Sequence, residues 1–398
     1  MAEAFLTARS QERGLVFDLL AYAASNPASG SAHGIPARRL EEVDNRQMQW
    51  VSDAGLAPLL YRASREGIHQ VPGPRRDMLL SADLTAIAWH GNLIDATREI
   101  VEACEARGIR VTLLKGISIS DQFYPDAHLR PMGDIDILAP LSAYATVEST
   151  IRGLGYTPNP DYQHREGAHH GAPLFHRGWH VWVEVHGALF SEDTALRNGR
   201  VFSPSHVAAH SVGSTFHGSA VNRLADELQL VYIASSWVRD LSGYGIRASL
   251  VPPLLDAIYL LNATGHALNW DQLLGWLDNP MAIASLHVML SYLSRNDLCR
   301  VAPPILSRLA SSQDVIGPFA LRIIHSMLDK YLLGGRPFSR LIRDWHASVV
   351  LSTLLAPGSS GRKLASVPWN ILFPPSVAER YSVRYQLGRI AKALRGKA

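Results

Sequence analysis

Hydrophobic residues recur at helical spacing along most of the chain. After Pro72-Gly73-Pro74, where proline suits the first turn of a helix, apolar residues follow every three or four positions as far as Val101. This spacing predicts one long helix over residues 74–107. Before it, we expect a helix at 11–23, a linker rich in helix-breaking residues at 25–36, and renewed helical spacing from Ala37. After it, helices are expected at 223–240, 251–264, 270–277, 281–294, 315–333 and 376–395.

The pattern changes between residues 109 and 190. Gly108 is a typical helix stop, and short runs of apolar residues, some alternating with polar ones, follow it. Such runs are typical of strands that bury one or both faces. The sequence predicts strands at 109–114, 134–138 and 181–187, with helices at 116–123 and 141–153 between them.

This order of elements indicates an α+β fold, in which a small mixed β-sheet core is flanked by an N-terminal and a C-terminal helical region. The chain has 398 residues, which is more than one hydrophobic core usually holds. We therefore expect three units, covering residues 1–107, 108–220 and 221–398.

Composition favours a soluble globular protein, because 47% of the residues are hydrophobic and 18% are charged. No run approaches the roughly 20 apolar residues that a membrane span needs. The first 13 residues carry charges where a secretory signal would be apolar, so export is not expected. Two cysteines far apart in the sequence, Cys104 and Cys299, suit reduced thiols, and the expected location is the cytoplasm.

The formal net charge of +3 is close to balanced and gives no sign of a nucleic-acid partner. Only residues 389–397 are locally basic. A solvated final helix with cations near its C-terminal end accounts for them, and a contact with a membrane or RNA is the alternative.

The strongest chemical signal is the segment Asp134-Ile-Asp-Ile137. Side chains alternate between the faces of a strand, so Asp134 and Asp136 share one face while Ile135 and Ile137 share the other. Adjacent carboxylates repel each other, and a divalent cation relieves this by taking oxygen ligands from both. The pair is therefore a candidate metal site, with a solvated strand edge as the alternative.

The strand at 181–187 supplies a candidate third carboxylate. Its valines are expected to face the core, which leaves Trp182, Glu184 and His186 on the opposite face. If the two strands are close, Glu184 completes a cluster with Asp134 and Asp136; otherwise it is a charged residue on a solvent-facing strand. Three acidic oxygens suit Mg²⁺, with Mn²⁺ as the alternative ion, since Mg²⁺ keeps positions for water and substrate phosphates.

Candidate phosphate ligands precede the aspartates. Lys115 and Gly116 stand where a predicted strand passes into a helix, and the N–H groups of a helix start bind phosphate when glycine allows close approach. Arg130 adds a second cation for a polyphosphate. Ser118 is a further candidate contact, although it also fits a helix-surface residue. The alternative for Lys115 and Arg130 is pairing with carboxylates or covering a helix start.

These segments resemble an uncharacterised bacterial nucleotidyltransferase family of the polymerase-β-like superfamily. The resemblance implies a short mixed sheet flanked by helices, and transfer of a nucleoside monophosphate from an NTP with release of pyrophosphate. It rests on Leu113-Leu-Lys-Gly116, Tyr124-Pro125, Arg130-Pro-Met-Gly-Asp-Ile-Asp-Ile-Leu138 and Val183-Glu-Val-His186, and extends to Asp256, residues 269–271 and residues 372–374.

The resemblance implies that Asp134, Asp136 and Glu184 are the metal-binding and catalytic residues, and that Gly116 is the glycine of the first motif. One departure concerns that motif. The superfamily usually has Gly-Ser or Gly-Gly followed by the aspartates about a dozen residues later, whereas here Ile117 follows Gly116 and the gap is longer. The phosphate-binding assignment of Lys115-Gly116 therefore depends on the narrower family's own variant.

Histidines crowd the region before Glu184. Imidazole is a common zinc ligand, so a zinc site within 164–180, and with it a zinc-dependent hydrolase, is one alternative. The spacings match no standard zinc pattern, and these rings could instead line a substrate cleft. The residues are His164, His169, His170, His176, His180 and His186.

Two further residue types have open roles. His186 is a candidate nucleotide-site residue, as a partner of the carboxylates or a general base, with a hydrogen-bonded strand histidine as the alternative. Trp179 and Trp182 could stack on a base, although aromatic residues in strands more often pack against neighbours.

The sequence therefore predicts an Mg²⁺-dependent nucleotidyltransferase that uses an NTP and a hydroxyl or phosphate of a small-molecule or peptide acceptor. The rival hypothesis is a non-catalytic module with the same fold that binds nucleotide or a partner. Neither the acceptor, the base preference nor the oligomeric state follows from the sequence.

Overall fold

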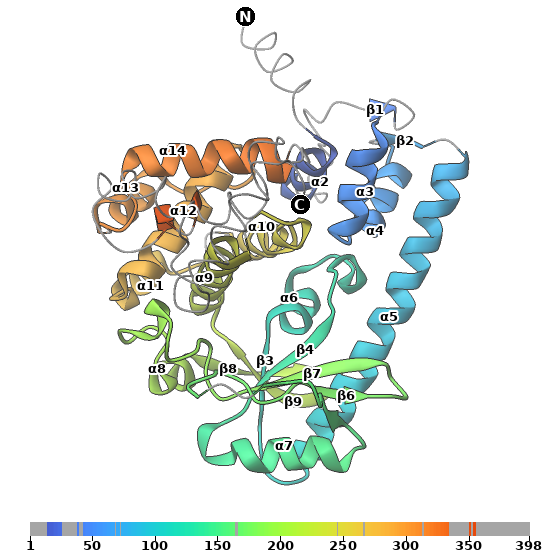
Figure 1. Ribbon diagram of the computed structural model, residues 1–398, viewed down its shortest axis with the longest axis vertical. Helices are drawn as coiled ribbons and strands as arrows, with labels where there is room; N and C mark the ends of the chain where they lie inside the picture. Colours follow the sequence, from blue (N-terminus) through green and yellow to red (C-terminus); the bar gives the residue numbers. More distant parts are fainter. Residues whose placement is uncertain are drawn as a thin grey trace, which may run out of the picture.

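A seven-stranded mixed sheet lies between α7 (Tyr144–Gly153) and the larger helical part of the structure, a computed structural model (Figure 1). The strands are ordered β5-β6-β7-β4-β3-β9-β8. Their bounds are Thr112–Leu114 (β3), Asp134–Leu138 (β4), Thr157–Pro158 (β5), Leu174–His176 (β6), Val181–His186 (β7), Ser211–Phe216 (β8) and Ser219–Leu224 (β9). The structure describes residues 14–25, 38–39, 43–67, 69–71, 73–163, 166–244, 246–265, 267–312, 314–333, 350–351 and 353–355.

The central strands run in both directions. Strand β4 pairs in parallel with β7 and antiparallel with β3, and β3 pairs in parallel with β9. In this register Asp136 lies opposite Glu184 on β7 and opposite Leu114 on β3. Directly opposed residues point to the same face of a sheet, so the three side chains share one face.

The opposite face is the first hydrophobic core. Alternate residues of β4 and β7, among them Ile135, Ile137 and Val183, are completely buried there. They pack against α5 (Gly73–Glu105) and α7 (Tyr144–Gly153), which cover this face in Figure 1. Burial of this apolar surface fixes the register, because a shift of one residue would turn the aspartates into the core.

Helices from both ends of the chain build a second core. The N-terminal helices α2 (Leu15–Ala24), α3 (Asn45–Asp53) and α4 (Ala57–Arg65) share it with the C-terminal helices. Trp50 Nε1 donates to the Leu332 carbonyl at 2.9 Å, and Asn262 Nδ2 donates to the Ala23 carbonyl at 3.1 Å. The C-terminal elements are α9 (Asp226–Tyr244), η5 (Ala248–Leu250), α10 (Pro252–Thr264), α11 (Trp270–Trp276), α12 (Pro280–Arg295), α13 (Pro303–Ser312), α14 (Pro318–Met327) and η6 (Leu328–Leu333).

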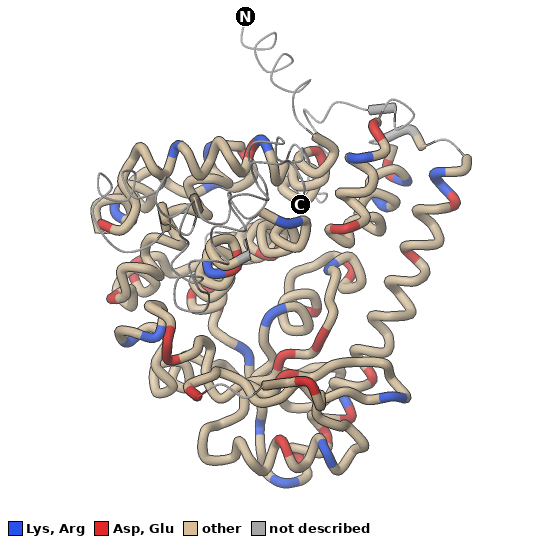
Figure 2. The backbone as a smooth tube through the Cα atoms, in the orientation of Figure 1, with Lys and Arg blue, Asp and Glu red and all other residues tan. Residues whose placement is uncertain are grey.

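Short elements complete the described chain. Helix α6 (Lys115–Phe123) follows β3 without a loop and lies between the sheet and the helical part (Figure 1). Charges of both signs are spread over the helices, and acidic positions mark β4 and β7 where they meet the helical part (Figure 2). The other elements are β1 (Arg38–Arg39), paired in parallel with β2 (His69–Gln70), η2 (Ala127–Leu129), η3 (Leu141–Ala143), η4 (Ala195–Arg197) and α8 (Pro204–Ala209).

The α+β class is confirmed, and most predicted elements lie within a few residues of their observed bounds. Three expectations need correction. Helical spacing does not resume at Ala37, because β1 precedes α3. The helix predicted at 223–240 starts at Asp226, because β9 continues to Leu224. The hairpin β8–β9 and helix α13 were not predicted. The boundary predicted at residue 220 falls within β9, and the helix predicted at 376–395 lies outside the described residues.

Among the described residues, none of the helices combines the length and apolar character that crossing a membrane requires.

Candidate active site

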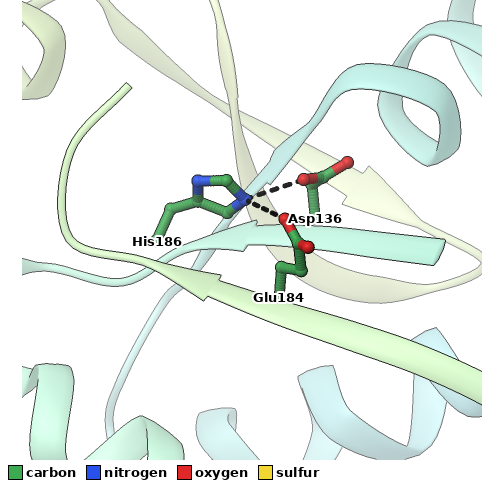
Figure 3. A group of neighbouring side chains, drawn as sticks. All are labelled: Asp136, Glu184 and His186. Carbon is green, nitrogen blue, oxygen red and sulfur yellow. Dashed lines mark hydrogen bonds and ion pairs between the residues drawn. The ribbon is translucent and has the colours of Figure 1, made fainter. Parts of the chain in front are cut away.

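The polar face of β4 and β7 gathers three potential metal ligands. Asp136 and Glu184 are opposite each other in the parallel pair, and His186 follows two residues later on the same face. One ligand atom of each lies within 4.8 Å of the others (Figure 3). The strand alternation predicted from the sequence therefore brings Asp136 and Glu184 together.

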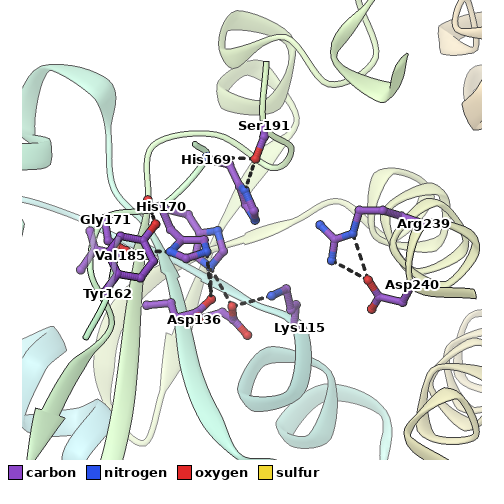
Figure 4. Close-up of polar contacts among 12 residues, drawn as sticks. Lys115, Asp136, Tyr162, His169, His170, Gly171, Val185, Ser191, Arg239 and Asp240 are labelled. Carbon is purple, nitrogen blue, oxygen red and sulfur yellow. Dashed lines mark hydrogen bonds and ion pairs between the residues drawn. The ribbon is translucent and has the colours of Figure 1, made fainter. Parts of the chain in front are cut away.

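Asp136 is the centre of this group. Its side chain is 4% exposed, and Oδ1 accepts hydrogen bonds from Lys115 Nζ at 2.6 Å and His186 Nε2 at 2.7 Å (Figure 4). Burial opposes ionisation, but the Lys115 charge and the His186 hydrogen bond outweigh it and hold the pKa of Asp136 well below its usual range. Asp136 is therefore a permanent carboxylate.

Asp134 lies on the same face, two residues before Asp136, but outside the group of three. Burial, followed by the negative charges of Asp136 and Glu184, raises its pKa to about 7. This carboxyl group is thus destabilised as an anion. A divalent cation between these oxygens would remove the repulsion, so the donor set fits the ion expected from the sequence.

His186 is best placed as a partner of Asp136. Its side chain is 0% exposed, and burial lowers its pKa, so the ring is neutral. Nδ1 has no hydrogen-bond partner among the described residues, which places the ring proton on Nε2, facing Asp136. Metal-binding histidines usually donate a proton from their other nitrogen, and Nδ1 has no acceptor for it. The geometry thus favours a hydrogen-bonding role over direct coordination.

Lys115 contacts Asp136 and also lines a neighbouring cavity. It is the first residue of α6, and its φ of +46° lies in the left-handed region that non-glycine residues rarely adopt. Such strain tends to persist where function requires it. The side chain is 28% exposed and lines a cavity of about 410 Å³ between α6, α9, α10 and the end of α3.

Gly116 follows at a point of close approach. A Cβ atom there would come within 2.6 Å of Met132 Cγ and 3.0 Å of an Arg130 guanidinium nitrogen. Glycine therefore lets the segment that leads into β4 pack directly on the start of α6. This contact sets the position of Lys115 relative to Asp134 and Asp136.

The other two candidate phosphate ligands are engaged within the protein. Ser118 is completely buried, Oγ accepts from Gln122 Nε2 at 2.9 Å, and it does not line the cavity. Arg130 lines the cavity but donates twice to Asp256, from Nε at 3.1 Å and from a terminal nitrogen at 2.8 Å. Tyr124 Oη donates to the same carboxylate at 2.7 Å. Arg130 thus forms the carboxylate pair that was the alternative to phosphate binding.

Residues 42–295 match a family described as an uncharacterised nucleotidyltransferase. The chain belongs to this nucleotidyltransferase family. The matched region runs from α3 through the sheet to the end of α12, so it contains the carboxylates, Lys115 and the helices that enclose the cavity. Residues 372–374, part of the resemblance seen in the sequence, lie outside both the match and the described residues. No curated protein gives a significant match.

The contribution of α9 to the cavity wall was not predicted from the sequence. Gln229, Tyr232, Ser236 and Arg239 line the cavity at intervals of three or four residues, which places them along one side of the helix. Arg239 faces Lys115 across the site in Figure 4, while its Nε donates to Asp240 at 3.0 Å. The signal in the sequence was a polar row in a largely apolar helix.

Part of the histidine-rich segment lies beside the carboxylates. The rings of His169 and His170 lie 5.2 Å and 5.4 Å from that of His186, measured between centroids. His169 Nδ1 contacts Ser191 Oγ at 2.6 Å, and burial lowers the pKa of His169 to about 2. Among the described residues, the segment holds no group of three ligands close enough for one ion, and His164 lies outside them.

The tryptophans of this region are packed within the protein. The ring of Trp182 lies 4.7 Å from that of Phe175, and Trp179 Nε1 donates to Glu99 at 3.1 Å. Neither residue lines the 410 Å³ cavity. These contacts favour the packing interpretation over base stacking.

Proposed function

We propose that the protein transfers a nucleoside monophosphate from an NTP to a hydroxyl or phosphate group of an acceptor, with release of pyrophosphate and dependence on Mg²⁺. Mn²⁺ is the alternative ion. The supporting observation is the position of Lys115, whose side chain contacts Asp136 and also lines a cavity large enough for a small ligand. The side chain of Lys115 therefore lies between a candidate metal-binding carboxylate and this cavity.

Asp136 and Glu184 would hold the ion, with Asp134 as the third carboxylate. When bound, a divalent cation neutralises charge on the transferring phosphoryl group and orients it for in-line displacement. His186 fixes the orientation of Asp136 through its 2.7 Å hydrogen bond. Strands β4 and β7 are adjacent in the sheet, so Asp136 and Glu184 are already close together. They would bind one ion without rearrangement of the backbone.

Lys115 and Arg239 would receive the triphosphate. Lys115 donates a hydrogen bond to Asp136, and with a divalent ion held by Asp136 its ammonium group would be released to turn toward the phosphates. Arg239 approaches from α9 on the other side of the cavity. Two cations on opposite walls stabilise the charge that develops on the leaving pyrophosphate.

The reaction then forms a bond between the acceptor oxygen and the α-phosphorus and breaks the bond to the β-phosphate oxygen. The proton of an acceptor hydroxyl passes to the carboxylate of Glu184. A cavity of about 410 Å³ supports a small-molecule or peptide acceptor rather than a folded nucleic acid. A cytoplasmic location is proposed with this function, supported by Cys104 and Cys299, which form no disulfide.

The test is transfer of label from an α-³²P-labelled NTP to candidate acceptors, with pyrophosphate release measured in parallel. Asp136→Asn is expected to lower the rate by at least about 100-fold, since a metal-binding carboxylate is lost. Glu102→Gln, an exposed charge change on α5, is the control and should transfer normally. Normal transfer by Asp136→Asn would overturn the assignment, and nucleotide binding without Mg²⁺ dependence or pyrophosphate release would favour the non-catalytic module.

A further inference from the structure

Gln229 is a buried amide without an internal partner. It is 1% exposed and lines the 410 Å³ cavity, and neither Oε1 nor Nε2 hydrogen-bonds to any of the described residues. Removing an amide from water without replacing its hydrogen bonds destabilises a folded protein, so buried groups of this kind are few in native structures. An amide of this kind on a cavity wall is available to hydrogen-bond with a ligand that enters the cavity.

Gln229 lies at the start of α9, the helix that follows β9. Helix α9 begins at Asp226, immediately after β9 leaves the sheet at Leu224, so Gln229 is in its first turn (Figure 1). Tyr232, one turn later, is also on the cavity wall, and the charges of Lys115 and Asp136 act on its phenol. Burial raises the pKa of Tyr232, so its hydroxyl stays neutral.

The chemistry of these two residues suits a neutral group rather than a phosphate. The Gln229 carboxamide offers one acceptor and two donors, and the Tyr232 hydroxyl can donate or accept. Vicinal hydroxyls match this set, because each can donate one hydrogen bond and accept others. Phosphate oxygens only accept, and Lys115, which lines the same cavity, is available to them.

We propose that Gln229 and Tyr232 bind the ribose hydroxyls of the donor nucleotide and make the protein selective for ribonucleotides. This inference rests on the proposed function, which places the α-phosphate beside Asp136 and Glu184. The ribose is bonded directly to that phosphate and is therefore the part of the nucleotide within reach of the first turns of α9. The base lies farther along the cavity.

The test is calorimetry on the full chain with Mg²⁺ and three ligands: α,β-methylene-ATP, its 2′-deoxy counterpart and inorganic tripolyphosphate. The wild-type protein is expected to bind the ribonucleotide about tenfold or more tightly than the deoxynucleotide, since a site built for a hydroxyl leaves polar groups unpaired when it is missing. Gln229→Leu should reduce this ratio to about one and leave tripolyphosphate affinity unchanged.

Two further variants separate recognition from folding. Tyr232→Phe keeps the ring and should lower the same ratio. Ser235→Ala is the matched control, because Ser235 is a completely buried residue on α9 whose hydroxyl also has no hydrogen-bond partner among the described residues but does not line the cavity. It should leave the ratio unchanged. The ligand-free melting temperature of Gln229→Leu should equal or exceed that of the wild-type protein, because an unpaired buried amide has been removed.

The outcomes distinguish failure of the ribose assignment from failure of the proposed function. If the wild-type protein binds no nucleotide with Mg²⁺, the proposed function fails. If it binds both nucleotides equally, or if Gln229→Leu weakens them by the same factor or not at all, the ribose assignment is wrong while the function stands. A large drop in the melting temperature of Gln229→Leu would also contradict it, by showing that the amide has a structural role.

Discussion

Asp136 shows how much of the site a single residue organises. Its carboxylate accepts a hydrogen bond from Lys115 on one side and from His186 on the other, and the Lys115 charge balances its own before any ligand arrives. Asp134, on the same strand face, has no hydrogen-bond or ion-pair partner among the described residues, and burial and the charge of Asp136 disfavour its ionised form. The two aspartates of one short motif therefore have opposite electrostatic roles.

The raised pKa of Asp134 predicts how stability depends on pH. Its pKa rises from an ordinary value of 3.8 to about 7 in the fold, so between these values the folded protein holds a proton that the unfolded chain has lost. Stability of the metal-free protein should therefore fall as pH rises from about 4 to 7. Asp134→Asn removes this titration and should be more stable than wild type by on the order of 2 kcal/mol at pH 8.

Chemical denaturation at pH 5 and pH 8, with chelator present, measures this difference. Asp95→Asn, which removes a half-exposed charge on α5, is the control and should follow the wild-type pH curve. Parallel pH curves for Asp134→Asn and wild type would show that the carboxyl group titrates normally. Addition of Mg²⁺ at pH 8 should stabilise the wild-type protein more than Asp134→Asn.

The shared face of the two aspartates could be predicted from the sequence, because side chains along a strand alternate between its two faces. Once one face of β4 is apolar, the positions of Asp134 and Asp136 follow from local geometry alone. The role of Gln229 could not be found in this way. Gln229 became a candidate because it lines a cavity whose walls come from elements more than 100 residues apart in the sequence. No local sequence pattern predicts that these elements meet.

At the scale of elements, the strands that could be predicted from the sequence are those in which buried apolar residues alternate with polar ones. Strands β4 and β7 alternate cleanly between buried apolar and polar residues and were predicted at nearly their observed bounds. In β9 the alternation is hidden, because Arg223 is 2% exposed yet lies within the strand. Its guanidinium group donates to Asp121 and to the Ser118 carbonyl on α6, partners about 100 residues away. A buried ion pair across such a distance has no local signature.

The junction of β3 and α6 yields a prediction about Gly116. Gly116→Ala places a methyl group where Met132 now lies, and Met132 must move into the cavity that it lines. We expect a stability loss of about 1 kcal/mol, typical of mild overpacking. Transfer activity should fall more, roughly tenfold in kcat/KM, because small displacements at a reacting centre have large effects on rate.

Gly91→Ala is the matched control for this variant. Gly91 lies in α5, and no atom is within 4 Å of the position that its Cβ would take. This change should stabilise the protein by about 0.5–1 kcal/mol through helix propensity and leave activity unchanged. Equal activity of the two variants would show that the close contact at Gly116 does not position Lys115.

At the scale of the whole molecule, the sheet and the helical part meet around one buried ion pair. Arg130, in the segment before β4, and Asp256, on α10, are 14% and 3% exposed in their side chains. Tyr124 adds a third hydrogen bond to the carboxylate. Since both charged residues line the cavity, the contact that joins the two parts also shapes the proposed substrate site.

Removing one partner of this ion pair should lower the free energy of unfolding. Arg130→Met leaves the Asp256 carboxylate buried without its cation, and removal of one partner of a buried pair typically destabilises a protein by about 3–5 kcal/mol. The double variant Arg130→Met with Asp256→Leu should recover much of that loss, because an apolar pair replaces the buried charges. Equilibrium unfolding in urea gives both values. Arg308→Met, which removes an exposed partner of Asp271, should change stability by less than about 1 kcal/mol.

The same three proteins distinguish a structural role of Arg130 from phosphate binding. If Arg130 only joins the two parts, the double variant should regain nucleotide affinity together with stability. If its charge also serves the triphosphate, stability should return while tripolyphosphate affinity stays at least about tenfold below wild type, since a charge-assisted hydrogen bond contributes roughly 1.5–3 kcal/mol. We expect the first result, because Asp256 accepts from Nε and one terminal nitrogen of the guanidinium group, and the Pro131 carbonyl accepts from the other terminal nitrogen.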